Sequence, residues 1–454
     1  MKPNALLPLA LLALSLIGCN KKSDDPNPTP PQQELSPQQL IERLSTKVVT
    51  LNTVDPAGPT TDLEALSPLL RDKQVIGVGE ATHGTSEFNK MRARLFRYGV
   101  ANWGLKMVAV EIHFGAGVAL DNYIRTGQGN LAQILRNSGY WIYTTDEFAA
   151  LVEWMKNYNV GKTEAERLKI YGVDAQPQGA VNSVNWLQAY FTSNAPSYVS
   201  AFDQATAGIR QGYPEFNGLT PEQQLAQGAG IFRQYQDRIN GVIAYLTTNQ
   251  AALTAQSGVA TYRLAVQHAQ VLLQGMTQGG LGYAGSAYRD EYMAQNLKWA
   301  SEYENNAKVM VMAHNGHIEK GMSPGAGGPQ KWMGTNLKEL YGNRYYAVAL
   351  FFNEGSFRAS TPSGNQAFTL RPLPQSFTAA LSMMQKPLFF MDIASVSQDA
   401  ALRSALDQRY LFYNPGAIWA SGLEDVKAAQ GINLVQYCDG VIYVDKTTAT
   451  TVLL

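Results

Sequence analysis

The feature that most constrains the fold is a series of short apolar runs, continuous rather than alternating, spread along the chain. They cover residues 75–79, 107–110, 168–173, 309–313, 345–352, 388–393 and 441–444. Runs of this length and β-branched content are typical of strands covered on both faces, which occur in mostly parallel sheets. Helical patterns separate the runs. The sequence therefore predicts an α/β fold with three α/β/α layers around a mostly parallel central sheet.

The ends of these runs carry the first indication of function. The first four runs lead directly into Glu80, Glu111, Asp174 and His314. Open parallel sheets place their ligand sites at the carboxyl ends of the strands. We therefore expect Glu80, Glu111 and His314 to converge along one rim of the sheet, with Asp174 as a further candidate.

The domain organisation follows from composition and periodicity. Of 454 residues, 45% are hydrophobic and 16% are charged. This is enough apolar material for one large core. Residues 182–288 have apolar positions at helical spacing, so we interpret them as a helical insertion in a catalytic domain of residues 35–454. The formal charge is zero and no basic run stands out, so no nucleic-acid partner is expected.

Residues 1–34 are predicted to be a targeting segment rather than part of the fold. Residues 1–18 have a positive start and an apolar stretch typical of a signal peptide. The ending Leu-Ile-Gly-Cys resembles a bacterial lipobox, which implies cleavage before Cys19 and lipid on its sulfur. Residues 19–34 are polar and proline-rich, as in an extended tether. We expect a lipid-anchored protein of the cell envelope, on a periplasmic or surface face; an ordinary signal peptide with an incidental cysteine is the alternative.

Cysteine content adds one point. The chain has two cysteines, and if Cys19 carries lipid, Cys438 has no disulfide partner. A lone cysteine in an apolar setting is more often packed than nucleophilic, so we interpret Cys438 as a core residue.

The segment Gly-Val-Gly-Glu-Ala-Thr-His-Gly at residues 77–84 is the densest in candidate chemistry. A strand ends at Glu80, and a helix is predicted to begin near Ser86 with Ser86 or Thr85 as its N-cap. The positive end of that helix favours the neutral form of His83, which suits a general base. Alternatively, the segment is a strand–loop–helix junction whose glycines serve only the turn.

Arg92 strengthens the catalytic interpretation. It falls on the apolar stripe of the predicted helix, whereas Arg94 and Arg97 are expected to face elsewhere. An arginine on a buried face needs an anionic partner, and Glu80 and Glu111 are the nearest candidates. The alternative is a side chain that covers the edge of the helix with its charge in water.

The chain has only five histidines, and two of them follow the fourth apolar run. His314 and His317 flank Asn-Gly, a turn that is able to bring both rings to the opening of the same site. His113 follows Glu111 and either approaches the site or lies in a surface loop. His268 lies inside a helical pattern, so we interpret it as a packed or helix-surface histidine.

These motifs together resemble the erythromycin esterase family. The resemblance rests on GEATHG, the arginine twelve residues after its glutamate, VAVEIHFG and AHNGHI. It also includes the stretches at residues 144–159, 288–299 and 354–359. The motifs run in family order from about residue 75 to the C-terminus.

The resemblance implies hydrolysis of a macrolide lactone ester by a histidine-activated water, without a serine nucleophile or a cofactor. It carries a catalytic role to Glu80, His83, Arg92, Glu111, His314 and His317. It implies that His83 deprotonates water and that Glu111 or Glu80 orients His83. His314 and Arg92 would then polarise or neutralise the developing oxyanion.

The substrate is less constrained than the chemistry. Macrolide-resistance esterases need no lipoprotein leader in the cytoplasm, so another lactone or an envelope-derived ester also fits the small-molecule substrate. Tyr140, Trp141 and Tyr143 are candidates for an apolar cleft wall, although a core role fits them equally.

Three other functions fit parts of the sequence. Residues 321–325 match the G-x-S-x-G pattern of serine hydrolases, but Pro324 after Ser323 has no N–H for an oxyanion hole. The carboxylates and histidines also form a plausible ligand set for a metal-dependent hydrolase. A non-catalytic lipoprotein that binds haem or another small ligand is the third alternative.

Overall fold

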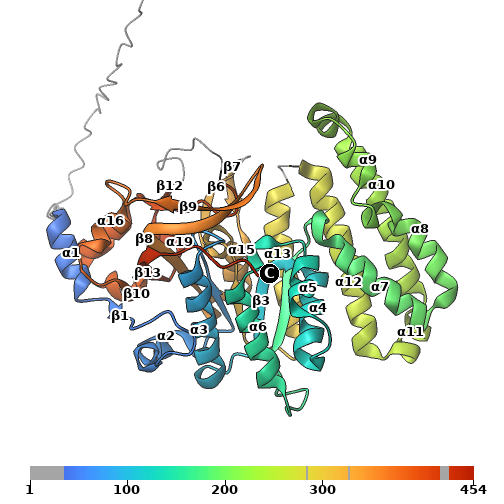
Figure 1. Ribbon diagram of the computed structural model, residues 1–454, viewed down its shortest axis with the longest axis horizontal. Helices are drawn as coiled ribbons and strands as arrows, with labels where there is room; N and C mark the ends of the chain where they lie inside the picture. Colours follow the sequence, from blue (N-terminus) through green and yellow to red (C-terminus); the bar gives the residue numbers. More distant parts are fainter. Residues whose placement is uncertain (1–34, 283–284, 326–327, 420–428, 454) are drawn as a thin grey trace, which may run out of the picture. The chain divides into compact units, whose positions relative to one another are not determined.

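The central sheet of the computed structural model is built from nine strands among the described residues, which are 35–453 without 283–284, 326–327 and 420–428 (Figure 1). The strands are β1 (Val49–Thr50), β2 (Val75–Val78), β3 (Met107–His113), β4 (Lys169–Asp174), β5 (Val309–Met312), β8 (Tyr345–Thr361), β9 (Gly364–Leu370), β10 (Leu388–Asp392) and β13 (Gly440–Thr447). Their order is β1-β10-β13-β8-β2-β5-β3-β4, with β9 paired to β8.

Most pairs in this sheet are parallel. Strands β13, β8, β2, β5, β3 and β4 run parallel to one another, while β10, β1 and β9 join through antiparallel pairs. All residues of β2 are buried, as a strand covered on both faces requires. Each of the apolar runs in the sequence forms a strand of this sheet. The predicted α/β fold with a mostly parallel sheet is confirmed.

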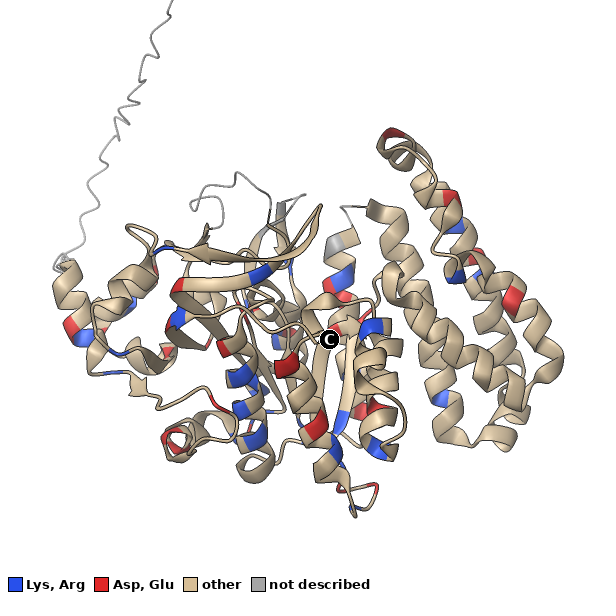
Figure 2. Cartoon of the chain, viewed as in Figure 1, with Lys and Arg blue, Asp and Glu red and all other residues tan. Residues whose placement is uncertain are grey.

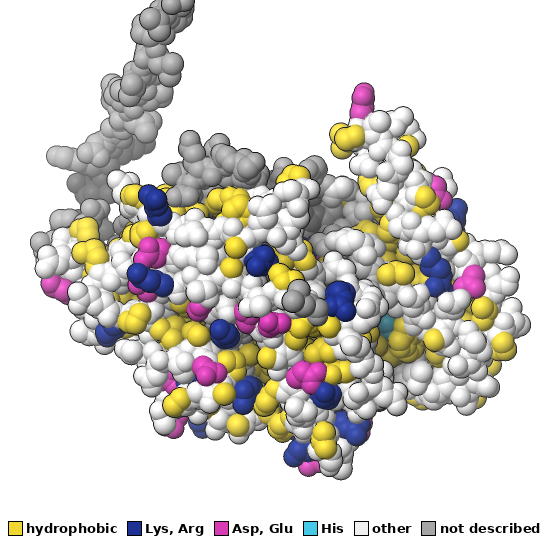
Figure 3. Space-filling view, viewed as in Figure 1, with side chains coloured by type: hydrophobic (Ala, Val, Ile, Leu, Met, Phe, Trp, Pro, Cys, Tyr) yellow, Lys and Arg dark blue, Asp and Glu magenta, His cyan; other side chains and the backbone are white. Residues whose placement is uncertain are grey.

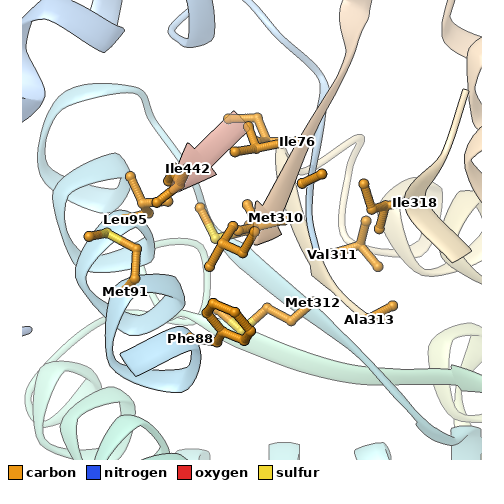
Figure 4. Packing of buried hydrophobic residues seen from close by; sticks show 14 of the residues in the cluster. Ile76, Phe88, Met91, Leu95, Met310, Val311, Met312, Ala313, Ile318 and Ile442 are labelled. Carbon is orange, nitrogen blue, oxygen red and sulfur yellow. The ribbon is translucent and has the colours of Figure 1, made fainter. Parts of the chain in front are cut away.

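Helices cover the sheet on both faces. On one face lie α3 (Ser86–Asn102), α4 (Phe114–Thr126) and α6 (Asp146–Asn159), and on the other lie α13 (Gly285–Tyr303) and α15 (Met333–Tyr341) (Figure 1). Figure 4 shows the packing of the first face, where Phe88 and Leu95 of α3 lie on the side of Met310 and Ile442. Val311 and Ile318 lie toward the opposite side. The apolar stripe of α3 therefore seals one side of the sheet directly beside the end of β2.

A group of helices beyond β4 has a hydrophobic core of its own. It comprises α7 (Ala180–Asn194), α8 (Val199–Arg210), α9 (Pro214–Asn217), α10 (Pro221–Thr248), α11 (Gln250–Ser257) and α12 (Val259–Leu281), called the helical lobe below (Figure 1). Phe191, Phe202 and Tyr235 are buried in its core. The chain leaves the sheet after β4 and returns through α13, so the lobe interrupts the sheet between β4 and β5.

Shorter elements connect these layers. They include α1 (Pro37–Ser45), α2 (Ser67–Leu70), α5 (Leu131–Asn137), η2 (Trp141–Tyr143), α14 (Asn315–Ile318), α16 (Phe377–Ser382), α17 (Ile393–Val396), α18 (Ala400–Leu406) and α19 (Leu434–Tyr437). Two hairpins add β6 (Met322–Gly325) with β7 (Gly328–Lys331), and β11 (Tyr410–Tyr413) with β12 (Ala429–Ile432).

The surface and the ends of the chain bear on the remaining expectations. Lysine, arginine, aspartate and glutamate side chains are interspersed over the face shown in Figure 3. Among the described residues, no helix has the length and apolar character needed to cross a bilayer. The predicted signal peptide, Cys19 and the tether fall within Met1–Glu34, outside the described residues.

Two side-chain expectations are settled by burial. Cys438 is buried, and its burial raises the pKa of the thiol to about 12, which is the behaviour of a packed cysteine. Arg94, which is expected to face away from the apolar stripe of α3, is nevertheless buried. It is fully buried against the preceding segment, where it donates to Asp62 Oδ2 at 3.1 Å and to the carbonyl of Pro59. A partner on a separate segment of the chain thus overrides the local stripe.

Candidate active site

The turn after β2 brings Glu80 and His83 to the rim of the sheet. Gly79 N donates to Val348 O on β8, and Glu80 O accepts from Asn315 N beside β5. A Cβ at Gly79 would collide with the Asn315 side chain, and one at Gly84 would collide with the Arg358 carbonyl. The glycines of the motif therefore allow neighbouring segments to close tightly around His83.

Glu80 and His83 form a hydrogen-bonded pair. His83 Nδ1 lies 2.8 Å from Glu80 Oε1, and both side chains are buried. An ionised carboxylate only accepts hydrogen bonds, so Nδ1 carries the proton of the neutral ring. That tautomer leaves Nε2 unprotonated and able to accept a proton. The pair has the arrangement of an oriented general base.

Arg92 lies behind this pair. Its NH2 is 2.8 Å from Glu80 Oε2 and donates to Asn89 Oδ1 at 2.6 Å. Only 2% of the side chain is exposed. The apolar stripe of α3 thus turns Arg92 inward, onto Glu80. In this position Arg92 pairs with the Glu80 carboxylate and fixes its place, rather than facing an incoming substrate.

A second group of charged side chains surrounds Glu111 at the end of β3. Glu111 Oε1 accepts from Arg289 NH2 at 2.8 Å, and Oε2 accepts from the backbone N–H of His314 at 2.9 Å. Arg289 also contacts both oxygens of Asp174 through Nε and NH2, the closest distance being 2.6 Å. The guanidinium therefore bridges the ends of β3 and β4, in the bidentate manner that favours arginine over lysine.

His317 completes this second group as a cation. Its Nδ1 lies 2.6 Å from Asp290 Oδ1, and its Nε2 lies 3.2 Å from Glu111 Oε1 and 3.0 Å from Arg289 NH1. Burial alone lowers the pKa of His317, but the charges of Asp290 and Glu111 outweigh it and raise the pKa to about 10. His317 is therefore an imidazolium that donates to both carboxylates, and its contact with Arg289 is a close approach of two cations between shared anions.

Glu111 is held as a carboxylate by its neighbours. Burial raises its pKa, but the positive charge of His317 and its hydrogen bond, followed by the charge of Arg289, bring the pKa well below its ordinary value. His83 also acts on the pKa of Glu111, which indicates that the two groups are close enough to interact electrostatically. The strand-end residues Glu80, Glu111, Asp174 and His314 thus belong to one continuous site.

His314 is neutral. Burial, and then the electrostatic interaction with His83, lower its pKa to about 3. Its Nδ1 accepts from Gly316 N at 3.2 Å, and its Nε2 lies 3.3 Å from Ala81 O. Since a carbonyl oxygen only accepts, Nε2 carries the proton of the ring. The rings of His314 and His83 are 5.3 Å apart between centroids. His314 therefore forms the wall beside His83.

The two remaining histidines have structural positions. His113 caps α4, where its Nδ1 accepts from Gly115 N, and burial lowers its pKa to about 4. It is buried, which excludes the surface-loop alternative. His268 is buried in the lobe, stacks on Trp186 and contacts Ser183 Oγ at 2.9 Å.

The three aromatic residues proposed for a cleft wall, Tyr140, Trp141 and Tyr143, do not share one environment. Tyr143 is fully buried; its hydroxyl donates to Met312 O at 3.1 Å and accepts from Glu111 N at 3.0 Å. Of the two roles that the sequence left open for Tyr143, the structure shows the core role, because the hydroxyl ties β3 to β5 from inside the core. Tyr140 and Trp141 are half-buried and line a cavity, described below.

Arg289 and Asp290 were missed as site residues by sequence reasoning. Both lie in the family-like stretch at residues 288–299, near the start of α13. The pattern contained a usable indication: Asp290, Met293 and Leu297 are all buried and share one face of α13 at helical spacing. Charged residues on such a face require buried partners of opposite charge.

Ser323 has no nucleophile geometry. It lies in the antiparallel hairpin β6–β7 rather than between a strand and a helix, as a nucleophilic serine of this motif would. Its Oγ accepts from Trp332 Nε1 at 2.6 Å. The G-x-S-x-G match is therefore a coincidence of sequence.

The donor groups of the cluster are mostly engaged with one another. Across the described part of the chain, no group of three or more His, Cys, Asp or Glu side chains is arranged to hold a metal ion. The Arg289 guanidinium lies between Glu111 and Asp174, where a cation ligated by both would have to sit. His314 and His317 use both ring nitrogens in contacts within the protein, which leaves neither free as an axial haem ligand.

A buried carboxyl next to the cluster gives a first prediction. Burial raises the pKa of Glu319 from its ordinary 4.5 to about 8. Between these two pH values the unfolded chain releases a proton that the folded chain keeps, so the free energy of unfolding falls as pH rises. Glu319→Gln removes this loss and is expected to stabilise the protein by about 1–3 kcal/mol near pH 8, and by much less near pH 5. Urea unfolding at both pH values measures the difference; equal gains at both would contradict it.

Comparison with known proteins locates the chain among relatives. A family model described as erythromycin esterase matches residues 100–447. Erythromycin esterase type II of Escherichia coli is 23% identical over 331 residues, which is 68% of this chain and 76% of that protein. The matched family segment contains Glu111, Arg289, His314 and His317, whereas Glu80 and His83 precede it.

Solved structures show the same fold. A protein from Bacillus cereus is 23% identical, with a TM-score of 0.78 over 92% of this chain and 99% of that chain. A mutant of erythromycin esterase EreC in its open conformation is 16% identical, with a TM-score of 0.65 over 89% of this chain and 99% of that chain. The architecture of sheet, covering helices and helical lobe is therefore shared across proteins of low sequence identity.

Proposed function

The chain belongs to the erythromycin esterase family, and from that premise we propose that it hydrolyses a carboxylic ester or a macrolide-type lactone by a water that His83 activates. The observation that carries this proposal is the buried series of contacts from Arg92 to Glu80 and from Glu80 to His83. These contacts fix the tautomer of His83 in which Nε2 is unprotonated. A general base needs an available lone pair and a partner that stabilises its protonated form. Glu80 supplies the second requirement.

The reaction takes two proton transfers. His83 Nε2 accepts a proton from water as the water oxygen adds to the ester carbonyl carbon, and the carbonyl electron pair moves to its oxygen. The tetrahedral intermediate then expels the alcohol oxygen, which takes the proton back from His83. The products are a carboxylic acid and an alcohol.

Positive charge for the oxyanion comes from Arg289 rather than from Arg92. The Arg289 side chain is 15% exposed, compared with 2% for Arg92, so its guanidinium is the more accessible of the two to a substrate. Its position is fixed beforehand by Glu111 and Asp174, and preorganised cations are effective at stabilising developing negative charge. Glu111 and Asp174 thereby act as positioning residues for Arg289, and His317 acts as a positioning residue for Glu111.

The compartment is part of the proposal. We propose that the chain is carried through a membrane by its leader and held to it by lipid on Cys19, as its lipobox-like sequence indicates. A substrate that reaches the enzyme there lies outside the cytoplasm, which favours a diffusible lactone or an ester of the cell envelope.

The test is a hydrolysis screen of the full chain against a macrolide lactone and simple 4-nitrophenyl esters, with and without a metal chelator. We expect turnover of at least one ester, with the product heavier by one water in the lactone case. Turnover that survives chelation supports the water-activating histidine. A folded protein that cleaves none of the substrates would overturn the proposal, and activity that chelation abolishes would favour a metal-dependent hydrolase.

A further inference from the structure

A cavity of about 310 Å³ lies between α5–η2 and the β8–β9 hairpin. Its walls include Arg136, Tyr140, Trp141, Thr145, Arg358 and Asn365. The volume is at the lower end of that of small-molecule sites, enough for one substituent of a substrate.

The cavity adjoins the catalytic turn. Arg358 N donates to the carbonyl of Gly84 at 2.9 Å, and Gly84 directly follows His83. At the other side, burial raises the pKa of Tyr140 well above its ordinary value, and the charges of Asp174 and Arg289 act on it. Tyr140 therefore lies between the cavity and the second group of charged residues. The cavity therefore lies beside the turn that carries His83.

The cavity walls carry unbalanced positive charge. Arg136 contacts Gln133 Oε1 at 3.5 Å, and Arg358 contacts the carbonyls of Thr450 and Asn365, at 3.3 and 3.5 Å. Within the described residues, neither arginine has an ion pair, and no aspartate or glutamate lines the cavity. Figure 2 shows basic positions on α5 and on β8, on either side of the end of the chain.

Two acidic residues that contact the C-terminal segment, Glu87 and Glu147, are engaged with neutral groups there. Glu87 accepts from the N–H and hydroxyl of Thr448, and Glu147 accepts from Ser86 Oγ and Thr451 N. The two guanidiniums of the cavity are thus left with neutral acceptors, although guanidinium groups bind carboxylate and phosphate oxygens best.

We propose that this cavity is a subsite for an anionic group of the substrate, a carboxylate or a phosphate, with Tyr140 and Trp141 flanking the adjoining apolar part. The inference rests on the proposed function and narrows its substrate class to esters that carry a negative charge. Arg136 and Arg358 are then specificity-determining residues, because a neutral ester offers their guanidinium groups no anionic partner.

The experiment compares two esters of one leaving group, 4-nitrophenyl acetate and mono-4-nitrophenyl succinate. We expect a higher kcat/KM for the anionic ester in the full chain. In the double variant Arg136→Gln, Arg358→Gln, the ratio of kcat/KM for the anionic ester to that for the neutral ester should fall about tenfold. Arg233→Gln, at an exposed position of α10, is the matched control and should leave the ratio unchanged.

Binding measured by calorimetry separates this inference from the hydrolase proposal. 4-Nitrobenzoate and 4-nitrophenyl phosphate are the probes, and the stronger binder shows which anion the subsite prefers. Binding that is kept in His83→Ala but lost in the double arginine variant supports the subsite even if no ester is cleaved. His83-dependent hydrolysis without preference for the anionic ester, and without arginine-dependent binding, would overturn the subsite and leave the hydrolase intact.

Discussion

Replacing His83 by alanine is expected to lower kcat for ester hydrolysis by about 10³-fold, the middle of the range for loss of a general base. The contact between Nδ1 and Glu80 Oε1 leaves Nε2 as the lone pair that is available to water. KM should change little, because the ring acts on water rather than on the bound ester. Steady-state kinetics on the ester identified in the screen measures the effect.

Two further variants make that result specific. Ser323→Ala is expected to retain wild-type kcat, since Ser323 lies in a hairpin with its Oγ held by Trp332. Glu80→Gln keeps the size of the side chain and removes the charge that stabilises protonated His83, so it should also lose much of kcat. The mechanism is wrong if His83→Ala, folded by circular dichroism, keeps more than about a tenth of kcat.

Arg289→Leu should give the largest loss of stability among single changes at the site, about 3–5 kcal/mol. The guanidinium is the shared counter-ion of Glu111 and Asp174, both buried, and its removal takes away the ion-pair partner of Asp174 and leaves Glu111 paired with His317 alone. The free energy of unfolding in urea, compared with that of the wild type, measures this loss.

The control for this loss is an arginine with an exposed ion pair. Arg43 pairs with Asp399 at 3.1 Å, and its side chain is 51% exposed. Arg43→Leu should therefore cost less than about 1 kcal/mol. Adding Asp174→Asn to Arg289→Leu removes one of the orphaned charges and should restore part of the stability. Equal costs for Arg289→Leu and Arg43→Leu would show that the buried network adds no more stability than a surface pair.

The fold could largely be predicted because each inner strand is marked by its own short segment of sequence. A strand covered on both faces is apolar along its whole length, so each inner strand is recognisable from a handful of residues. The edge elements are not. Strand β9, whose residues are mostly exposed, and the hairpin β6–β7 lack such a run, and their pairing depends on neighbours outside the local pattern.

The site could be predicted to the extent that strand ends and one helix stripe define it. The ends of β2, β3 and β5 placed Glu80, Glu111 and His314 on one rim, and the stripe of α3 turned Arg92 inward. Arg94 lies outside that stripe and is buried nevertheless, because Asp62, on a different segment, supplies a partner that periodicity does not encode. Tyr143 resembled a cleft residue because composition cannot say where a hydroxyl finds its acceptor.

The place of the helical lobe in the chain has a consequence for how activity is acquired during folding. Glu111 and Asp174 precede the lobe, while Arg289 follows it on α13. Until the intervening helices have formed and α13 has docked, the rim holds two carboxylates with no guanidinium between them, and their mutual repulsion opposes closure. These are also contacts of long sequence separation, which form late in folding. We therefore expect regain of turnover to lag behind regain of secondary structure on refolding.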